Sequence, residues 1–456
     1  MKLGKSNNVF NQRKALCFVN MNAHYPVLKE VSHILQTEFN TMISFYFYSS
    51  LFDLTKEISD AKTLLFDTIV NNDFDKNHVN LTSYKPIRQE LNNNTLTSIF
   101  RKIKENQRKI KEMNGVINNI KPSFVLISDN TINYDISLFV KACKINSVDV
   151  FCVPFGLIVP NCILERLEKN SLKSSKSSKS SIKSIVSNIF PKYILKKNGN
   201  TYLPKSLTSI AALELIKAGS KRPWTWNAHN ITGVFVDSVF SKEFCLNQGL
   251  PLDKIILTQP IEKSSYKNSL SREELTQKLS LDPNLPILLF NVPAPLLGLI
   301  NLKGCDFNDP KSIIYAFLKL PTSIRGNANL IWTLHPRLKK EDYLFVESMG
   351  IKIIETSGAK LISACDVFIG NDSTLFKTAL FMSKPIINYQ VFGLKTDIFK
   401  NEKGYYTAKN KHQYINLLEM LLRDISVYNK AAKEIDYKRF GNDNSYPEIH
   451  EYLNQL

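Results

Sequence analysis

Two short polar motifs in the second half of the chain contain residues suited to binding an anion. The first is His335-Pro336-Arg337, which directly follows the apolar segment 330–334. A histidine can donate a hydrogen bond to a phosphate oxygen, and an arginine offers two parallel donors to the same group. We therefore expect His335 and Arg337 to bind phosphate. The alternative is a polar loop that contains an incidental histidine.

The second motif is Asn371-Asp372-Ser373-Thr374, which follows the apolar segment 366–370 and opens a predicted helix. Asp, Ser and Thr are common at helix N-termini, where unpaired backbone N–H groups favour an anion. The motif predicts that Asp372, Ser373 and Thr374 bind the same phosphate group as His335. Ordinary helix capping without a ligand is the alternative.

The segments around these motifs alternate between short apolar runs and helical patterns. Such an alternation is typical of parallel strands joined by helices, and the carboxyl ends of parallel strands meet at one edge of a sheet. The two motifs should therefore share one site. The strands expected around them are 287–291, 328–334, 351–354, 366–370 and 385–389.

A similar alternation begins near the start of the chain, with strands at 15–20, 42–48, 124–128 and 148–153. A chain of 456 residues usually forms more than one domain. We predict an α/β fold with two Rossmann-like domains facing each other across a cleft. Their predicted bounds are 1–225 for an acceptor domain, 226–425 for a nucleotide-donor domain, and 426–456 for helices that pack back towards the first domain.

Three segments, 330–337, 364–374 and 383–387, resemble the donor-binding domain of GT-B glycosyltransferases. They are most similar to the bacterial surface-polysaccharide group that includes the CDP-glycerol glycerophosphotransferases and capsule transferases. Segment 249–260 resembles the beginning of that domain. The resemblance implies transfer of a sugar or polyol-phosphate from a nucleotide-activated donor to a cell-surface polysaccharide or lipid-linked acceptor. It also implies that His335, Arg337 and residues 372–374 hold the nucleotide diphosphate, and that no cofactor is needed.

The chain departs from this family at two positions. Lys377 stands where relatives often carry a glutamate that binds a ribose or sugar hydroxyl, and a lysine cannot accept those hydrogen bonds. We expect Lys377 to contact a phosphate or an acidic donor sugar instead. Phe155-Gly156 stands where relatives often have a His-Gly pair, whose histidine is a candidate base. These departures leave open a catalytically inactive scaffold. A UDP-sugar 2-epimerase, which shares the fold, is a further alternative.

An inverting transfer needs a base that deprotonates the acceptor from the first domain. His24, in the loop after the first predicted strand, is the best candidate, and Asp129 after the strand 124–128 is the second. No Asp-x-Asp metal motif stands at a predicted strand end. The charge of the departing diphosphate would then fall to His335, Arg337 and the helix dipole, without a metal.

The chain carries 59 Lys and Arg against 41 Asp and Glu, an excess of 18 that indicates an anionic partner or a genome of low GC content. Basic, serine-rich residues concentrate in 164–200, which we interpret as a flexible insertion or as a loop that attracts anionic lipid headgroups. No basic patch with interleaved aromatic residues supports nucleic-acid binding.

The sequence has no apolar run of about 18 residues, and we expect no secretory signal because its first residues lead into a polar stretch. The seven cysteines are scattered, without a Cys-x-x-Cys pair, and predict reduced core thiols. We expect a cytoplasmic protein that attaches peripherally to the inner membrane face through 164–200.

Overall fold

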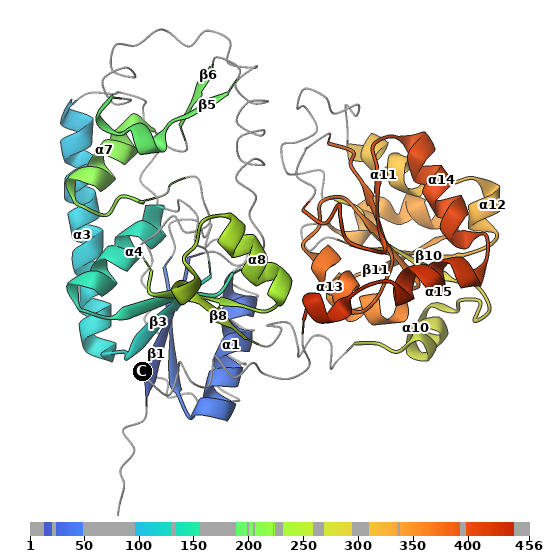
Figure 1. Cartoon of the computed structure of the whole chain (residues 1–456), viewed down its shortest axis with the longest axis horizontal. Coiled ribbons are helices and arrows are strands. Elements are labelled where there is room, and N and C mark those ends of the chain that lie inside the picture. Colours follow the sequence, from blue (N-terminus) through green and yellow to red (C-terminus); the bar gives the residue numbers. More distant parts are fainter. Residues whose placement is uncertain are drawn as a thin grey trace, which may run out of the picture.

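The computed structural model contains two six-stranded sheets, each covered by helices (Figure 1). All neighbouring strands within these two sheets are parallel. The structure describes residues 13–20, 24–48, 96–128, 134–154, 188–197, 200–203, 206–221, 223, 231–258, 269–293, 310–334, 338–392 and 398–441.

The first sheet has the strand order β2-β1-β3-β4-β7-β8. Its strands are apolar and buried, as expected where helices cover both faces of a parallel sheet. The strands are β1 (Lys14–Val19), β2 (Met42–Phe47), β3 (Phe124–Ile127), β4 (Asp149–Cys152), β7 (Gly233–Val236) and β8 (Ile255–Leu257). The helices are α1 (His24–Phe39), α3 (Leu96–Ile120), α4 (Tyr134–Ile145), α7 (Leu207–Leu215) and α8 (Val239–Asn247).

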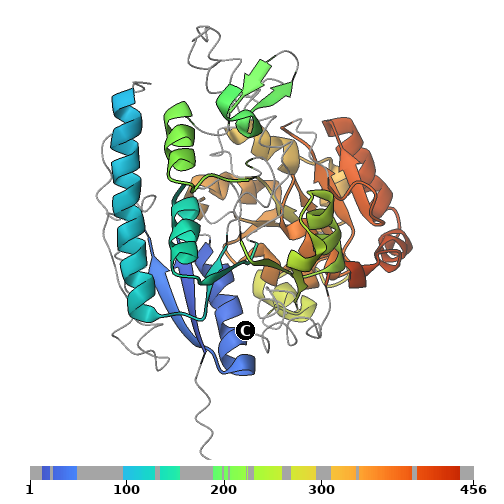
Figure 2. The same cartoon turned by 60° about the vertical axis from the view of Figure 1, so that its left-hand side comes forward.

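A small antiparallel hairpin, β5 (Leu195–Lys197) with β6 (Asn200–Tyr202), lies at one end of the first domain. The long helix α3 lies on the side of this domain that faces away from the second sheet, and α4 and α7 pack against it (Figures 1 and 2).

The second sheet has the order β11-β10-β9-β12-β13-β14, which is the 3-2-1-4-5-6 order of a dinucleotide-binding Rossmann sheet. The order reverses between β9 and β12. The strands are β9 (Ile287–Asn291), β10 (Asn329–Thr333), β11 (Ile351–Ile354), β12 (Val367–Gly370), β13 (Ile386–Tyr389) and β14 (Tyr405–Ala408). The helices are α10 (Arg272–Leu279), α11 (Pro310–Leu318), α12 (Thr322–Arg325), α13 (Leu375–Phe381), α14 (Lys411–Leu422) and α15 (Ile425–Lys433).

Short 3-10 helices complete both domains. They span Pro191–Tyr193, Leu252–Lys254, Lys340–Met349, Gly358–Lys360, Ile362–Ala364 and Tyr437–Arg439.

The predicted α/β fold with two Rossmann-like domains is confirmed, but the chain leaves the first sheet later than residue 225. Strand β7 pairs with β4, and β8 pairs with β7, so both belong to the first sheet and not to the donor domain. Phe235 of β7 stacks on Phe151 of β4, with ring centroids 5.3 Å apart. An apolar strand carries no sequence signal of which sheet it joins, and this explains the misplaced boundary.

The C-terminal segment packs mainly on the second domain. Tyr428 and Ala431 of α15 are part of the core of the second sheet. Farther along, the ring centroid of Phe440 lies 5.2 Å from that of Phe240 on α8, and α8 belongs to the first domain. The predicted return towards the first domain is therefore limited, within the described residues, to contacts near α8. Residues 442–456 lie outside the described part of the chain.

Candidate functional site

Three neighbouring strands of the second sheet bring polar residues together at its carboxyl edge. Asn291 at the end of β9 and Asn388 in β13 lie in register with Gly370, the last residue of β12. The predicted motif 371–374 follows Gly370 directly. This edge is next to the point between β9 and β12 where the strand order reverses, and ligands of open α/β sheets bind at such points.

The Ser373 side chain ties the turn to the neighbouring strand. Its hydroxyl donates to Asn291 Oδ1 at 3.1 Å and accepts from the backbone N–H of Leu375 at 3.2 Å. The hydroxyl proton is thus already used within the protein. Ser373 fixes the position of the turn, and its backbone is the part that remains able to meet a ligand.

Asp372, predicted to bind phosphate, has its side chain bonded to Asn388. The Asp372 backbone N–H donates to Asn388 Oδ1, and Asn388 Nδ2 donates to Asp372 Oδ1, each at 3.1 Å. Asp372 also has a φ of 42°, a left-handed conformation that aspartate tolerates better than most residues. The pair holds the turn in this conformation, and a carboxylate would in any case repel a phosphate.

Two backbone N–H groups of the turn remain available. Among the described residues, none accepts a hydrogen bond from the N–H of Ser373 or Thr374. Both groups stand just before α13, where N–H groups have no partner within the helix. Thr374 is exposed and has no capping hydrogen bond from its side chain. The turn can therefore offer two backbone donors and a hydroxyl.

Asn371 is buried at the same edge, with 8% of its surface exposed. Neither its Oδ1 nor its Nδ2 finds a hydrogen-bond partner among the described residues. Buried amides are nearly always hydrogen-bonded, so an orphaned one needs an explanation. The sequence motif 371–374 includes Asn371, but the sequence predicts no role for this residue. An asparagine at a strand end is common, and only the fold shows that Asn371 is buried.

Lys377, predicted to contact the donor, is paired with Asp237 across the two sheets. Its Nζ bonds Asp237 Oδ2, and the side chains are 19% and 12% exposed. The other carboxylate oxygen of Asp237 accepts from Ser241 Oγ at 2.9 Å and from Ser238 Oγ at 3.3 Å. The lysine charge is therefore neutralised by the protein. The sequence could not reveal this partner, which lies 140 residues earlier.

Cys245 on α8 lies close to this ion pair. Burial raises the pKa of its thiol, and the negative charge of Asp237 raises it further, while Lys377 has the opposite effect. The thiol therefore stays protonated and is a poor nucleophile. The five cysteines in the described ranges are free and buried, in agreement with the predicted reduced thiols.

The remaining predicted site residues lie outside what the structure describes. Asp129, His335 and Arg337 fall on such positions, and so does Phe155. His335 follows Leu334, whose backbone N–H bonds Ile354 O at the carboxyl end of β10 and β11. His24 is the first residue of α1, but its side chain is not described.

No group of three or more His, Cys, Asp or Glu side chains that could hold a metal ion occurs within the described ranges. No helix in the same ranges is long and apolar enough to cross a membrane.

No protein-family model matches the sequence, and no curated protein matches it. The structure is similar to UDP-GlcNAc 2-epimerase from Neisseria meningitidis bound to UDP-GlcNAc, with a TM-score of 0.55, 13% identity, and coverage of 97% of this chain and 100% of that one. It is also similar to S. aureus MnaA in a co-structure with UDP (TM-score 0.54, 11% identity, 98% of each chain). A third similar structure is the calicheamicin glycosyltransferase CalG4 (TM-score 0.54, 11% identity, 98% and 99%). These similarities show a shared fold, the two-domain GT-B architecture.

Proposed function

We propose that the chain binds a nucleotide-activated donor at the carboxyl edge of the second sheet and transfers its sugar or polyol-phosphate. The observation that carries this proposal is the buried Asn371 amide, which has no partner among the described residues. It stands beside the backbone N–H groups of Ser373 and Thr374, for which the described part of the chain supplies no acceptor. An amide donor, an amide acceptor and two backbone donors suit a diphosphate and an adjoining hydroxyl.

The fold supports a nucleotide as the ligand. The similar proteins from Neisseria meningitidis and S. aureus have UDP-GlcNAc and UDP in their structures. Their full-length similarity means that both domains of this chain have counterparts there.

For glycosyl transfer, the bond between the sugar anomeric carbon and the diphosphate oxygen breaks as the acceptor oxygen bonds that carbon. The nucleoside diphosphate leaves with the electron pair. His335, Arg337 and the N–H groups of Ser373 and Thr374 would stabilise its charge without a metal or cofactor. The acceptor proton passes to a base, for which we propose His24, with Asp129 as the second candidate.

The acceptor that we propose is a cell-surface polysaccharide or a lipid-linked precursor. The resemblance of the segments 330–337, 364–374 and 383–387 to surface-polysaccharide and CDP-glycerol-dependent transferases supports this choice. An anionic membrane would bring such an acceptor close, and the basic segment 164–200 is one candidate for the attachment.

Thermal unfolding in the presence of CDP-, UDP-, GDP- and CMP-linked donors tests the donor site. We expect one nucleotide class to raise the melting temperature, because a ligand that binds only the folded state stabilises it. His24→Ala should keep this rise and lose turnover, since His24 is proposed to act only on the acceptor. Folded protein that none of the donors stabilises would exclude the transferase.

A UDP-sugar 2-epimerase is the second candidate, favoured by the similarity to the Neisseria meningitidis epimerase over 97% of the chain. Proton NMR of UDP-GlcNAc incubated with the protein separates the two functions. An epimerase forms the C2 epimer without any acceptor, whereas the transferase leaves C2 unchanged. The paired state of Asp237 with Lys377 removes one acidic group that an epimerase could use between the domains.

A further inference from the structure

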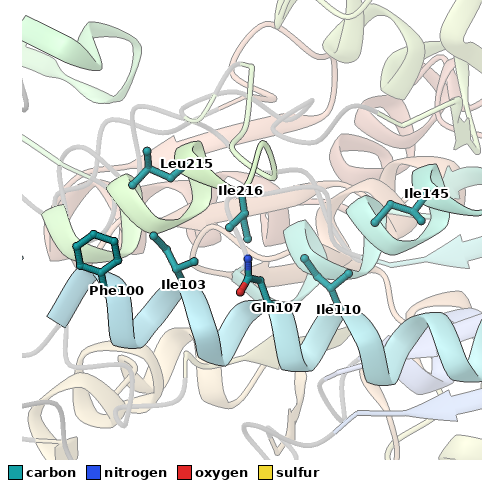
Figure 3. A pocket seen from close by; sticks show the side chains of 7 residues that line it. All are labelled: Phe100, Ile103, Gln107, Ile110, Ile145, Leu215 and Ile216. Atoms are coloured by element: carbon teal, nitrogen blue, oxygen red, sulfur yellow. The ribbon is translucent and has the colours of Figure 1, made fainter. Parts of the chain in front are cut away.

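An apolar groove lies on the outer side of the first domain, away from the second sheet. It has a volume of about 510 Å³ and runs between α3, the end of α4 and the end of α7. Figure 3 shows the side chains that line it: Phe100, Ile103, Gln107, Ile110, Ile145, Leu215 and Ile216. Three of them are unusually exposed for apolar residues, namely Phe100 at 64%, Leu215 at 63% and Ile145 at 54%.

Basic residues border this groove on α3. Arg101, Lys104, Arg108 and Lys111 are spaced by three or four positions, so they form one stripe along the helix, and all four are exposed. None of them forms an ion pair with another described residue. Beyond α3, Lys144 precedes Ile145, and Lys217 follows Leu215 by two positions; both lysines are exposed.

The nearby carboxylates do little to offset this positive charge. Glu105 is paired with Lys102 and Lys109, and Glu214 is paired with Lys192. Glu112 on α3 is half-buried, while the four basic residues of the stripe are exposed. The surface is thus apolar in its groove and at the exposed side chains of Phe100, Leu215 and Ile145, and it is positively charged around them.

We infer that this surface, the α3–α4–α7 face, docks on an anionic membrane. Exposed Phe, Leu and Ile side chains enter the boundary between headgroups and acyl chains, while Lys and Arg contact the anionic headgroups. A second copy of the chain fits poorly, since like charges would meet. Nucleic acid would find the phosphate-binding charges but would leave the aliphatic groove unfilled. The inference is independent of the proposed function, because it uses no residue of the nucleotide site.

Flotation with vesicles tests the docking. The full chain is mixed with vesicles of phosphatidylcholine, alone or with about one third phosphatidylglycerol. We expect binding only to the anionic vesicles, weakened by salt. The combined Arg101→Gln, Lys104→Gln and Arg108→Gln variant should bind on the order of a hundredfold more weakly. Phe100→Ser with Leu215→Ser should bind at least about tenfold more weakly at unchanged charge.

A matched control comes from α15 in the second domain, which also presents an exposed aliphatic residue and exposed lysines. Ile425, 62% exposed, is changed to Ser together with Lys430→Gln and Lys433→Gln. This variant should bind like the unaltered chain, and circular dichroism should show every variant folded.

Three results would overturn the inference. One is unaltered protein that binds neither kind of vesicle. Another is vesicle binding that neither α3–α4–α7 variant weakens. This includes the case in which only the deletion of residues 171–181 abolishes binding. The last combines two findings: the charge variant loses binding to duplex DNA, and the Phe100 and Leu215 variant binds vesicles as the unaltered chain does. Together they would assign the surface to nucleic acid.

Discussion

Three asparagines at the carboxyl edge of the second sheet differ in how their amides are used. Asn291 accepts from Ser373, and Asn388 exchanges two hydrogen bonds with Asp372. Asn371 has no such partner among the described residues. A buried polar group without a partner lowers stability, and it persists where a ligand uses it. We therefore assign structural roles to Asn291 and Asn388 and propose a ligand-binding role for Asn371.

Replacing Asn371 by Leu should leave stability nearly unchanged and weaken nucleotide binding. The substitution preserves the approximate shape and removes an amide that the described residues do not satisfy, so the free energy of unfolding should change by less than about 1 kcal/mol. The affinity for the nucleotide that stabilises the unaltered chain should fall about tenfold or more, equivalent to about 1.4 kcal/mol. Urea unfolding and isothermal titration calorimetry measure the two quantities.

Asn388→Leu is the matched control, because Asn388 is fully buried on the adjacent strand and its amide is bonded to Asp372. It should lower the free energy of unfolding by about 1–3 kcal/mol. If Asn371→Leu costs as much stability as Asn388→Leu, the Asn371 amide serves the fold and not a ligand.

The sequence predicts the polar turn at 371–374 correctly as a turn between a strand and a helix, because its residue types and the flanking apolar runs are local signals. The partners of the turn are not local. Asn291 lies 82 positions from Ser373, and Asp237 lies 140 positions from Lys377. Only the folded chain therefore shows which polar side chains are already hydrogen-bonded or ion-paired within the protein.

Helix α8 belongs to the first domain and is the element through which the second domain is held. Its Phe240 stacks on Phe399 with ring centroids 4.9 Å apart, and the Arg439 guanidinium lies 5.5 Å from the same ring. Arg439 also bonds Glu243 of α8 and Glu402 of the second domain. The apolar and ionic contacts together fix α8 against the second sheet.

Phe240→Ala should destabilise the protein by about 3–5 kcal/mol, since it removes a buried ring and leaves a cavity between the domains. Val239→Ala is the neighbouring control; Val239 is 36% exposed and should cost less than about 0.5 kcal/mol. Chemical unfolding measures both. Equal, small effects would mean that α8 does not hold the domains together.

Lys411, the first residue of α14, caps the end of α11. Its Nζ donates to Ala316 O at 2.5 Å and to Lys319 O at 3.0 Å. Burial, with a smaller contribution from the charge of Lys319, lowers the pKa of Lys411 to about 8. In the unfolded chain the pKa of a lysine is about 10.4.

Between these two pKa values the unfolded chain holds a proton on Lys411 that the folded chain lacks. The contribution of Lys411 to stability should therefore increase as the pH rises from about 8 to about 10. The neutral amine still donates to both carbonyls. The difference in unfolding free energy between the unaltered chain and Lys411→Met should grow in favour of the former across this range. A constant or shrinking difference would contradict the lowered pKa.

The positions of strands β7 and β8 can be predicted from the sequence, but the sheet that they join cannot. Their positions follow from short apolar runs with turn residues on either side, and both strands are observed. Their sheet is set by packing over long sequence distances, such as Phe235 on Phe151. The prediction that the second domain begins at 226 was wrong for this reason.

At the scale of the whole molecule, the Lys377–Asp237 pair joins the carboxyl edges of the two sheets. Lys377 lies on α13, one helical turn beyond Thr374, and Asp237 directly follows β7. The pair lies between the two domains, beside the proposed nucleotide site. We therefore expect the pair to hold the two domains together beside this site.

A double-mutant cycle with Asp237→Asn and Lys377→Met measures the interaction energy between these two side chains. Each single change should lower the free energy of unfolding by about 1–3 kcal/mol, less than for a fully buried pair because both side chains are partly exposed. The double variant should be more stable than the sum of the single effects predicts, by about 1 kcal/mol. Strict additivity would show that the two charges do not stabilise the domain contact.

Titration calorimetry of UDP, CDP, GDP and CMP into the full chain tests the proposed diphosphate site at the carboxyl edge of the second sheet most directly. We predict that at least one of these nucleotides binds once per chain and that inorganic pyrophosphate competes with it, because the donors proposed at Ser373 and Thr374 would bind the phosphates and not the base. Folded protein that binds none of UDP, CDP, GDP and CMP would contradict a diphosphate site there, and so would nucleotide binding that pyrophosphate leaves unchanged.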